Sequence, residues 1–155
     1  MSRSVEASLG GFLVDVDKWK ARLGHLAGEA IQELCLVVAQ NIVVGGQFSP
    51  GTPVDTGYAR SSWWIAVNSD TGESAVLGLN DKGAAAMEQI TLRILGVKSG
   101  DIVYLLTNTV YMRPLEYGHS QQAPAGMVRL TMAAGTIIAD YAAINTLRRN
   151  GMAVA

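Results

Sequence analysis

Hydrophobic residues recur at steps of three and four along residues 15–44, a spacing that places them on one face of a helix. Asp15 and Asp17 suit its first turn, where carboxylates cap free N–H groups and meet the positive end of the helix dipole. Gly45 and Gly46 mark its end. The pattern predicts a helix about 40 Å long, longer than the core of one small domain requires, so that one end is expected to reach a neighbouring subunit. The apolar stripe consists of Trp19, Leu23, Leu26, Ala30, Ile31, Leu34, Val37, Val38 and Ile42.

Residues 61–79 predict a β-hairpin. The first arm, residues 61–68, is rich in aromatic and β-branched side chains, residues 68–72 form a polar turn cluster, and residues 74–79 return. Trp63 and Trp64 are adjacent and must face opposite sides of a strand. One of them is expected in the core, and the other at the surface or beneath a helix or another subunit.

The second half of the chain predicts two further helices and a strand. Residues 82–95 favour a helix that ends at Gly96, although their β-branched side chains leave a partial strand over residues 90–95 as the alternative. Residues 101–107 form a continuous apolar run that fits a buried strand. Pro124 precedes a C-terminal helix over residues 125–149 that ends on basic residues. Together these elements predict one α+β domain: a small, mainly antiparallel β-sheet packed against a long N-terminal helix and a C-terminal helix.

A tightly specified turn precedes the first strand. Pro53 fixes its own φ, the carboxylate of Asp55 can accept N–H groups two residues on, and Gly57 permits a positive φ. With Thr56, these residues predict a rigid structural corner that presents a surface. The flanking Pro and Gly account for Asp55 as a turn residue, so a catalytic or metal-binding carboxylate is the less favoured alternative.

Composition narrows the function. The chain has 155 residues, 49% of them hydrophobic, which suffices for one domain with its own core. Its 12 basic and 13 acidic side chains are scattered and nearly balanced, which disfavours DNA binding through clustered positive charge. Cys35 is the only cysteine, so neither an intrachain disulfide nor a cysteine-based metal site is expected. No run of about 18 uninterrupted apolar residues and no signal-peptide pattern is present, so we expect a soluble protein with no membrane contact.

The two histidines offer little acid–base chemistry. His25 lies within the long helix, where a solvated or core-edge position is favoured. His119 stands close to Glu116 and Tyr117, and a Glu–His pair could support general acid–base catalysis. No activated nucleophile accompanies the pair at a recognisable spacing. A hydrolase-type enzyme that uses His119 and Glu116 is therefore a remote alternative, and no cofactor or metal is predicted.

Several short motifs carry a resemblance to a known family. In chain order they are Pro53-Val54-Asp55-Thr56-Gly57, Arg60 with Ser62, Asn108-Thr109-Val110-Tyr111, Glu116-Tyr117-Gly118 and Pro124-Ala125-Gly126-Met127-Val128. In order and spacing they resemble the small tail-completion and neck proteins of long-tailed bacteriophages, a family that includes head-tail connector components and is similar to the minor tail protein Z group of lambda-like phages. The chain departs from that pattern through an inserted segment over residues 81–100.

The resemblance implies a non-enzymatic virion protein, made in the host bacterial cytoplasm, that forms a ring at the head-tail junction. Six copies would match a tail tube and are preferred over twelve. The ring would touch connector and tail-tube or tail-terminator proteins, and DNA would pass through its lumen without specific binding. A phage accessory binding protein or assembly chaperone that is absent from the virion is the alternative. Candidate interface residues are Arg60, Trp63, Trp64, Tyr111, Glu116, Tyr117, Gly118, Pro124 and Met127.

Two finer expectations concern this surface. The resemblance places the motifs of Arg60 and Glu116 near the sheet and the ring interface, so an ion pair between them, either within one chain or between subunits, is a hypothesis. The uncharged loop over residues 118–126 is expected to be disordered alone and to become ordered against a neighbour. The sheet edge and the long helix would carry the ring contacts.

Overall fold

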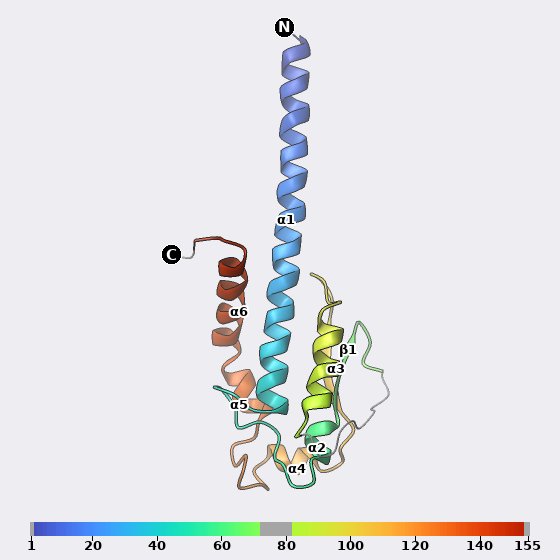
Figure 1. The fold of residues 1–155 in the computed structure, drawn as a ribbon, viewed down its shortest axis with the longest axis vertical. Helices are drawn as coiled ribbons and strands as arrows, with labels where there is room; N and C mark the ends of the chain where they lie inside the picture. Colours follow the sequence, from blue (N-terminus) through green and yellow to red (C-terminus); the bar gives the residue numbers. More distant parts are fainter. Residues whose placement is uncertain (1, 72–81, 154–155) are drawn as a thin grey trace.

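The structure, a computed structural model, describes residues 2–71 and 82–153. It confirms the predicted α+β class: a long N-terminal helix, a two-stranded antiparallel sheet packed against it, and a helical C-terminus (Figure 1). In chain order the elements are α1 (Ser2–Val43), α2 (Tyr58–Ser61), β1 (Trp63–Val67), α3 (Ala84–Ile94), β2 (Val103–Thr107), α4 (Met112–Glu116), α5 (Val128–Ala133) and α6 (Gly135–Arg149).

Helix α1 begins at Ser2, so the prediction that it starts at Asp15 or Asp17 is wrong. Both aspartates lie inside the helix and are exposed, and the carboxylate of Asp15 lies 3.9 Å from the amino group of Lys18. Aspartate is acceptable at an exposed interior position, so it marks a helix start only where the preceding chain cannot continue the helix. The end of α1 at Val43 is one residue from the prediction.

The sheet pairs β1 with β2 in an antiparallel register, in which Trp63 lies opposite Thr107 and Ile65 opposite Leu105. The predicted return strand over residues 74–79 lies outside the described residues. Trp63 is buried in the core, whereas Trp64 on the opposite face is half-buried. The prediction that one of the two tryptophans enters the core is therefore confirmed.

Residues 84–94 form helix α3, which settles the choice between helix and partial strand. One face of α3 is buried against α1 and β1, and it consists of Ala86, Met87, Ile90 and Ile94. The Arg93 guanidinium adds a hydrogen bond of 2.8 Å from α3 to the backbone carbonyl of Ile65 in β1. Helical periodicity thus outweighed the strand preference of the β-branched residues.

The predicted C-terminal helix is divided into α5 and α6 at Ala134 and begins at Val128 rather than at residue 125. The N–H of Ala134 is shared between the carbonyls of Leu130 and Thr131, which tightens the turn at the break. The preceding residues form a turn around the carboxylate of Glu116 and are not free to enter the helix.

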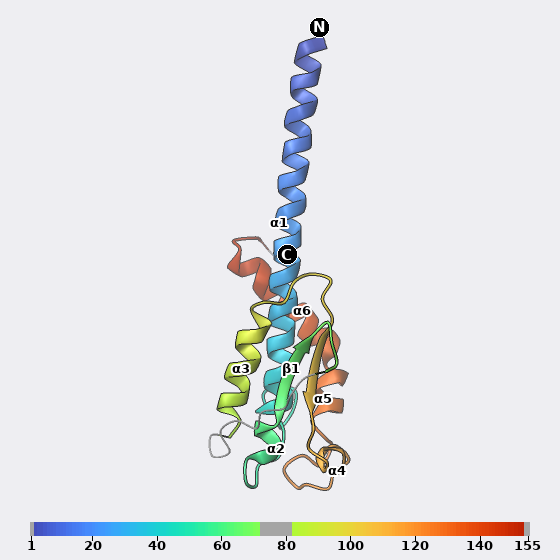
Figure 2. The same cartoon turned by 90° about the vertical axis from the view of Figure 1, so that its right-hand side faces the viewer.

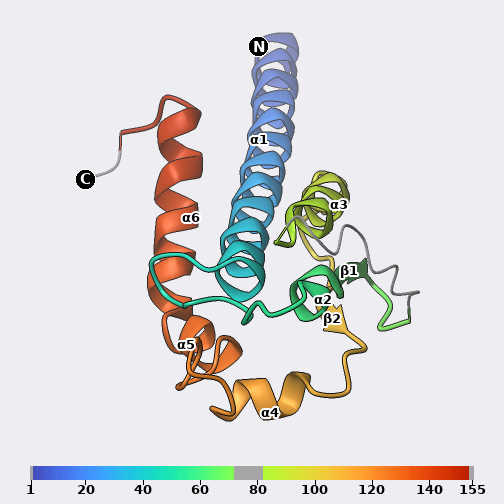
Figure 3. The same ribbon diagram turned by 60° about the horizontal axis from the view of Figure 1, so that its bottom comes forward.

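Helix α1 forms the axis of the molecule. Its C-terminal part is flanked by α6 on one side and α3 on the other, and the loop end carries α2, α4 and α5 (Figure 3). Its N-terminal half extends beyond every other element in two perpendicular views (Figures 1 and 2). The core cluster lies at the other end of α1 and includes Ala39, Ile42, Val43, Trp63, Ile65, Ile90 and Met127.

Within α1, Gly11–Val43 is long and apolar enough to cross a membrane by length and composition, the single such stretch among the described residues. Core helices of soluble proteins meet the same criterion. Here the C-terminal part of the stretch supplies Ala39, Ile42 and Val43 to the core.

Candidate functional site

The predicted corner is anchored by Thr52, the residue immediately before it. The Thr52 hydroxyl donates to the carbonyl of Ile42 at 2.8 Å and accepts the indole N–H of Trp63 at 2.9 Å. Its backbone N–H donates to the carbonyl of Val43 at 3.3 Å. Thr52 is fully buried, so one side chain joins the end of α1, the corner and the first strand.

Arg60 also binds Thr52, through the backbone carbonyl of that residue. Its guanidinium donates two hydrogen bonds to the carbonyl of Thr52, at 3.0 Å from Nε and 2.7 Å from Nη2, and a third of 3.4 Å to the carbonyl of Lys82. Partial burial lowers the pKa of Arg60, although the side chain stays charged at neutral pH. Arg60 therefore fixes backbone geometry and is not a free cation at this surface.

Gly57 has the predicted positive φ, 85°. Asp55, in contrast, does not accept the backbone N–H groups that the sequence predicted for it. The carboxylate of Asp55 is exposed and accepts no hydrogen bond among the described residues. Instead the Thr56 hydroxyl accepts the N–H of Tyr58 at 3.5 Å, a weak contact. The corner is held by Thr52, Arg60 and Gln122, so the interpretation of Asp55 as the turn-fixing acceptor is wrong.

The loop over residues 118–126 is tied directly to the corner. The side-chain amide of Gln122 accepts the N–H of Val54 and donates to its carbonyl, both at 2.9 Å. The N–H of His119 and its ring Nδ1 both meet the carbonyl of Pro114, at 3.2 and 3.1 Å. The loop is therefore ordered by contacts within one chain, and its predicted response to a neighbour stays a prediction.

Glu116 organises the turn that leads into α5. Its carboxylate accepts the backbone N–H groups of Met127 and Val128 at 2.9 Å and of Arg129 at 2.8 Å. The Arg129 guanidinium adds a bond of 3.2 Å to the carboxylate and one of 2.7 Å to the Glu116 carbonyl, and it stacks 5.0 Å from the centre of the Tyr117 ring. Three backbone N–H groups at a helix start, which would otherwise be unpaired, thus share one carboxylate.

The net effect of these contacts is to lower the pKa of Glu116. Burial alone would raise this pKa, but the hydrogen bonds from Arg129, Val128 and Met127 to the charged carboxylate outweigh burial. Glycine is required at residue 126, because a Cβ there would collide with the Glu116 carbonyl oxygen at a φ of +81°. The Glu116-Tyr117-Gly118 and Pro124-to-Val128 motifs are therefore two halves of one structural unit.

The first strand and the Asn108 motif are joined by hydroxyl groups. The Ser62 hydroxyl donates to the Ala59 carbonyl at 2.8 Å and accepts from Thr109 at 2.6 Å and from Thr107 at 2.8 Å. Ser62 and Thr109 are buried. The network therefore joins the start of β1 to the end of β2.

The structure does not bring Arg60 and Glu116 together within the chain, since each is engaged in a separate network. It does not form the His119–Glu116 pair either, because the carboxylate faces the start of α5 and the His119 ring meets the Pro114 carbonyl. Among the described residues, no group of three or more His, Cys, Asp or Glu side chains could hold a metal ion.

The exposed side of this end is aromatic. Tyr58 and Tyr111 lie with ring centres 6.4 Å apart, and burial, followed by the charges of Tyr58 and Asp55, raises the pKa of Tyr111. A shallow pocket of about 290 Å³ adjoins them, between the corner and His119. Val110 and Tyr117 are also exposed. We call the four side chains Tyr58, Val110, Tyr111 and Tyr117 the corner surface.

The remaining interface candidates are less available. Met127 and Trp63 are buried, and Gly118 and Pro124 are exposed parts of the turn around Glu116. The indole N–H of Trp64 is buried and has no hydrogen-bond partner among the described residues. Among the interface candidates, Trp64 therefore has a buried donor that lacks an acceptor within the described part of the chain.

Sequence reasoning missed the structural roles of Gln122, Arg129, Thr107 and Thr109. Gln122 reaches Val54 across 68 positions and Arg129 reaches Glu116 across 13, and no local periodicity marks such pairs. The available signal was the recurrence of hydroxyl residues at 107 and 109, although β2 ends at Thr107 and Thr109 lies just beyond it.

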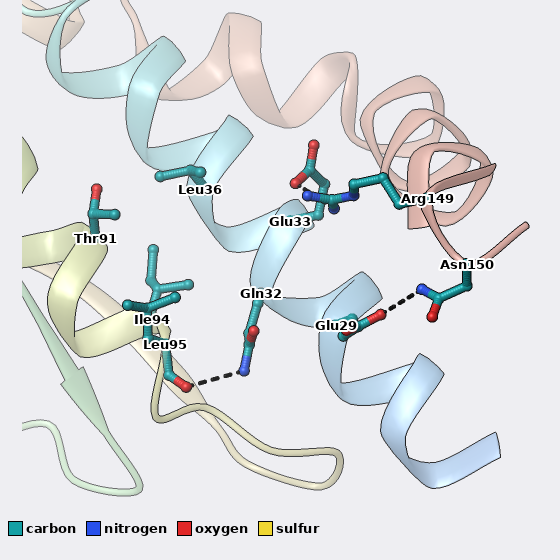
Figure 4. Close-up of a pocket in the computed structure, with 9 residues that line it drawn as sticks. All are labelled: Glu29, Gln32, Glu33, Leu36, Thr91, Ile94, Leu95, Arg149 and Asn150. Carbon is teal, nitrogen blue, oxygen red and sulfur yellow. Dashed lines mark hydrogen bonds and ion pairs between the residues drawn. The ribbon is translucent and has the colours of Figure 1, made fainter. Parts of the chain in front are cut away.

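A second polar cluster lies at the other end of α6. Glu33 pairs with Arg149 at 2.8 Å, Glu29 accepts from Asn150 at 2.6 Å, and Gln32 donates to the carbonyls of Leu95 and Val97 at 3.2 and 2.8 Å. Figure 4 shows the three α1 side chains turned toward two different neighbours, α6 and the end of α3. The cluster borders a cavity of about 300 Å³ and fastens α6 and α3 to α1.

Comparison of the chain with protein-family models, curated proteins and solved structures finds no significant match.

Proposed function

We propose that the chain is a structural protein of a tailed bacteriophage that forms a ring at the head-tail junction, as a tail-completion or neck protein. The observation that carries the proposal is the convergence of the motifs. Residues from Pro53 to Val128 that resemble the neck family in order and spacing lie at one end of the molecule and bond to their immediate surroundings there.

This convergence favours an architectural role. The polar groups of Arg60, Glu116 and Gln122 all bind backbone groups of the same chain. The positions of these three residues in the sequence are then explained by the backbone that they hold in place, and no catalytic role is needed to account for them. The corner surface is the part of this region that stays exposed. It is mainly aromatic, and aromatic residues are enriched in protein–protein interfaces.

A ring requires two different surfaces on each copy, because cyclic contacts repeat one patch against another. The sheet edge and the long helix would carry these ring contacts, and the corner surface would meet the connector or the tail-tube and terminator layer. The family context favours six copies over twelve. DNA would pass through the lumen without specific contact, and the protein would be part of the virion.

The test is deletion of this reading frame from its parent phage or prophage, followed by induction and negative-stain electron microscopy of the lysate. Filled capsids apart from tails, or tails of abnormal length, are expected. Normal infectious particles would overturn the proposal. If the defect occurs but mass spectrometry finds the protein absent from purified particles, an accessory binding protein or assembly chaperone replaces the ring.

Complementation separates the corner surface from the fold. The deletion is complemented with the wild type, with Tyr111→Ala and with Tyr141→Ala, which removes a comparably exposed tyrosine from α6. Tyr111→Ala is expected to reduce infectious titre, and Tyr141→Ala to restore it. Equal titres from the two variants would remove the corner surface from the proposal.

A further inference from the structure

The N-terminal half of α1 has an apolar seam with no cover. Phe12, Trp19 and Leu23 are 63%, 62% and 44% exposed. Val16 belongs to the same row, four residues after Phe12 and three before Trp19. No other element reaches this part of the helix (Figures 1 and 2). The first side chain of the same row that the domain buries is Leu26, which is 8% exposed.

Successive side chains in this row are separated alternately by four and by three residues. It runs Val5, Leu9, Phe12, Val16, Trp19, Leu23, Leu26 and Ala30. Such a repeat averages 3.5 residues and is the signature of positions a and d of a coiled coil. An isolated helix facing a globular core follows 3.6, so this repeat is suited to a second helix alongside.

The glycines of the helix support the same assignment. With Leu9, Val16 and Leu23 at position a, the glycines at 10, 11, 24 and 28 all fall at b, c or f, away from the seam. A Cβ at Gly11 or Gly24 would meet nothing within 4 Å, so packing within the chain does not require either glycine. Each weakens an isolated helix by about 0.5–1 kcal/mol, which makes support from a partner more important.

Charge selects the orientation of the partner. In a parallel, in-register pair, position g faces position e of the next heptad, which sets Asp15 beside the partner's Lys20 on both sides. An antiparallel pair that overlaps the same segment would set Asp15 beside the partner's Asp15. Asp15 is also close to Lys18 of its own helix, at 3.9 Å, an exposed contact that a stronger neighbour can replace.

We propose that residues 5–23 of α1 form a parallel coiled coil with the same segment of a second copy of this chain. The seam of Phe12, Val16, Trp19 and Leu23 would be buried, and the two domains would lie at the same end. This inference does not depend on the virion role, because it rests on the helix alone.

The test compares two exposed aliphatic residues of the same segment. Leu23→Glu places a charge in the seam, whereas Val14→Glu places the same charge at position f, where the side chain is 53% exposed. By sedimentation equilibrium of the full chain, the wild type and Val14→Glu are expected to exceed the monomer mass of 16.4 kDa. Leu23→Glu should weaken association by about a hundredfold or more.

Two results would overturn the inference. The wild type could be monomeric at about 100 μM, where a micromolar dimer is mostly assembled. Leu23→Glu and Val14→Glu could weaken association equally, which indicates general stickiness. A monomeric wild type that binds phosphatidylglycerol vesicles would assign the apolar row to a lipid surface instead.

Cysteine crosslinking tests the orientation. In a Cys35→Ala background, Phe12→Cys brings two thiols together across a parallel seam, and Asp17→Cys at position b keeps them apart. Rapid disulfide formation by Phe12→Cys alone supports the parallel pair. Failure of Phe12→Cys to crosslink in an associated protein would exclude it.

Discussion

The two ends of α1 lie in opposite environments. At the C-terminal end, Ile42 and Val43 are buried, and their carbonyl groups accept hydrogen bonds from Thr52. Toward the N-terminus, Phe12 and Trp19 are exposed. This half of α1 extends beyond every other element (Figure 1). One end has its contacts within the chain, and the other leaves its apolar side chains uncovered.

The comparison separates residues that are recognisable in the sequence from residues that are available to a partner. The motif residues at the loop end fall into two groups. Arg60, Ser62 and Glu116 are bonded to backbone groups of their own chain, whereas Val110, Tyr111 and Tyr117 are exposed. The exposed half of α1 has no motif beyond its spacing, yet it presents the larger uncovered apolar row. Surfaces for assembly are therefore better sought among the exposed motif residues and along α1 than among the motif residues that bind backbone groups of their own chain.

The largest effect is expected from Gly126→Ala at the loop end. The new Cβ would collide with the carbonyl oxygen and carboxylate of Glu116 at a φ of +81°. We expect a loss of about 2–4 kcal/mol in the free energy of unfolding, measured by urea denaturation. Gly135→Ala is the control, because a Cβ there meets nothing within 4 Å. Equal stability of the two variants would show that the turn around Glu116 can shift freely.

A smaller loss is expected from Thr52→Val, which keeps the shape of the side chain and removes its hydroxyl. The indole N–H of Trp63 would lose its acceptor in a buried position, at a cost of about 1–3 kcal/mol in unfolding free energy. In a double-mutant cycle with Trp63→Phe, the cost of Thr52→Val should fall. Additive losses would indicate that the hydroxyl acts through Ile42 alone.

Glu116→Gln is expected to cost about 1–2 kcal/mol at neutral pH, because a neutral amide is a weaker acceptor for three backbone N–H groups. The folded pKa of Glu116 is lowered from its ordinary 4.5, so its contribution is complete above that value. The contribution is lost as pH falls through the lower, folded pKa.

The stability difference between wild type and Glu116→Gln should therefore narrow as the pH is lowered from 7 toward 3, about one and a half units below the ordinary value. Urea denaturation at each pH measures it, with Glu88→Gln on the exposed side of α3 as the control. A difference that stays constant with pH would contradict the role of the charged carboxylate.

The smallest effect, and one of opposite sign, is expected from Gly24→Ala in the exposed half of α1. Replacing an unneeded glycine should stabilise the local helix by about 0.5–1 kcal/mol, seen as slower amide hydrogen exchange around residue 24. The unfolding midpoint of the domain should move little, because a Cβ at residue 24 would meet nothing within 4 Å. A raised midpoint would mean that the two ends of α1 unfold together.

The class of fold followed from local patterns. Periodicity placed α1, α3 and the strand at β2, and Gly45 with Gly46 placed the end of α1 to within a residue. The start of α1 was misplaced because Asp15 is an equally acceptable interior residue. The C-terminal helix was misplaced for a different reason: its first residues are held by Glu116, more than ten positions away.

The candidate site was recognised but its bonding was not. The sequence placed Gly57 in a turn and one of the two tryptophans in the core, because each follows from the geometry of one or two residues. The resemblance suggested an ion pair between Arg60 and Glu116, although within the chain the partners of these two side chains are backbone carbonyl and N–H groups. Charge alone cannot rank a distant carboxylate against adjacent backbone groups.

By itself, the sequence determined the elements whose signals lie within a few residues: the long helix, the aromatic strand, the corner glycine and the α+β class. Only the tertiary structure decided that Thr52, Gln122 and Arg129 join the motifs, because hydrogen bonds between distant segments leave no periodic trace. It also decided which part of the α1 stripe is buried. Periodicity specifies that a face is apolar, whereas the presence of a neighbouring element specifies whether that face is covered.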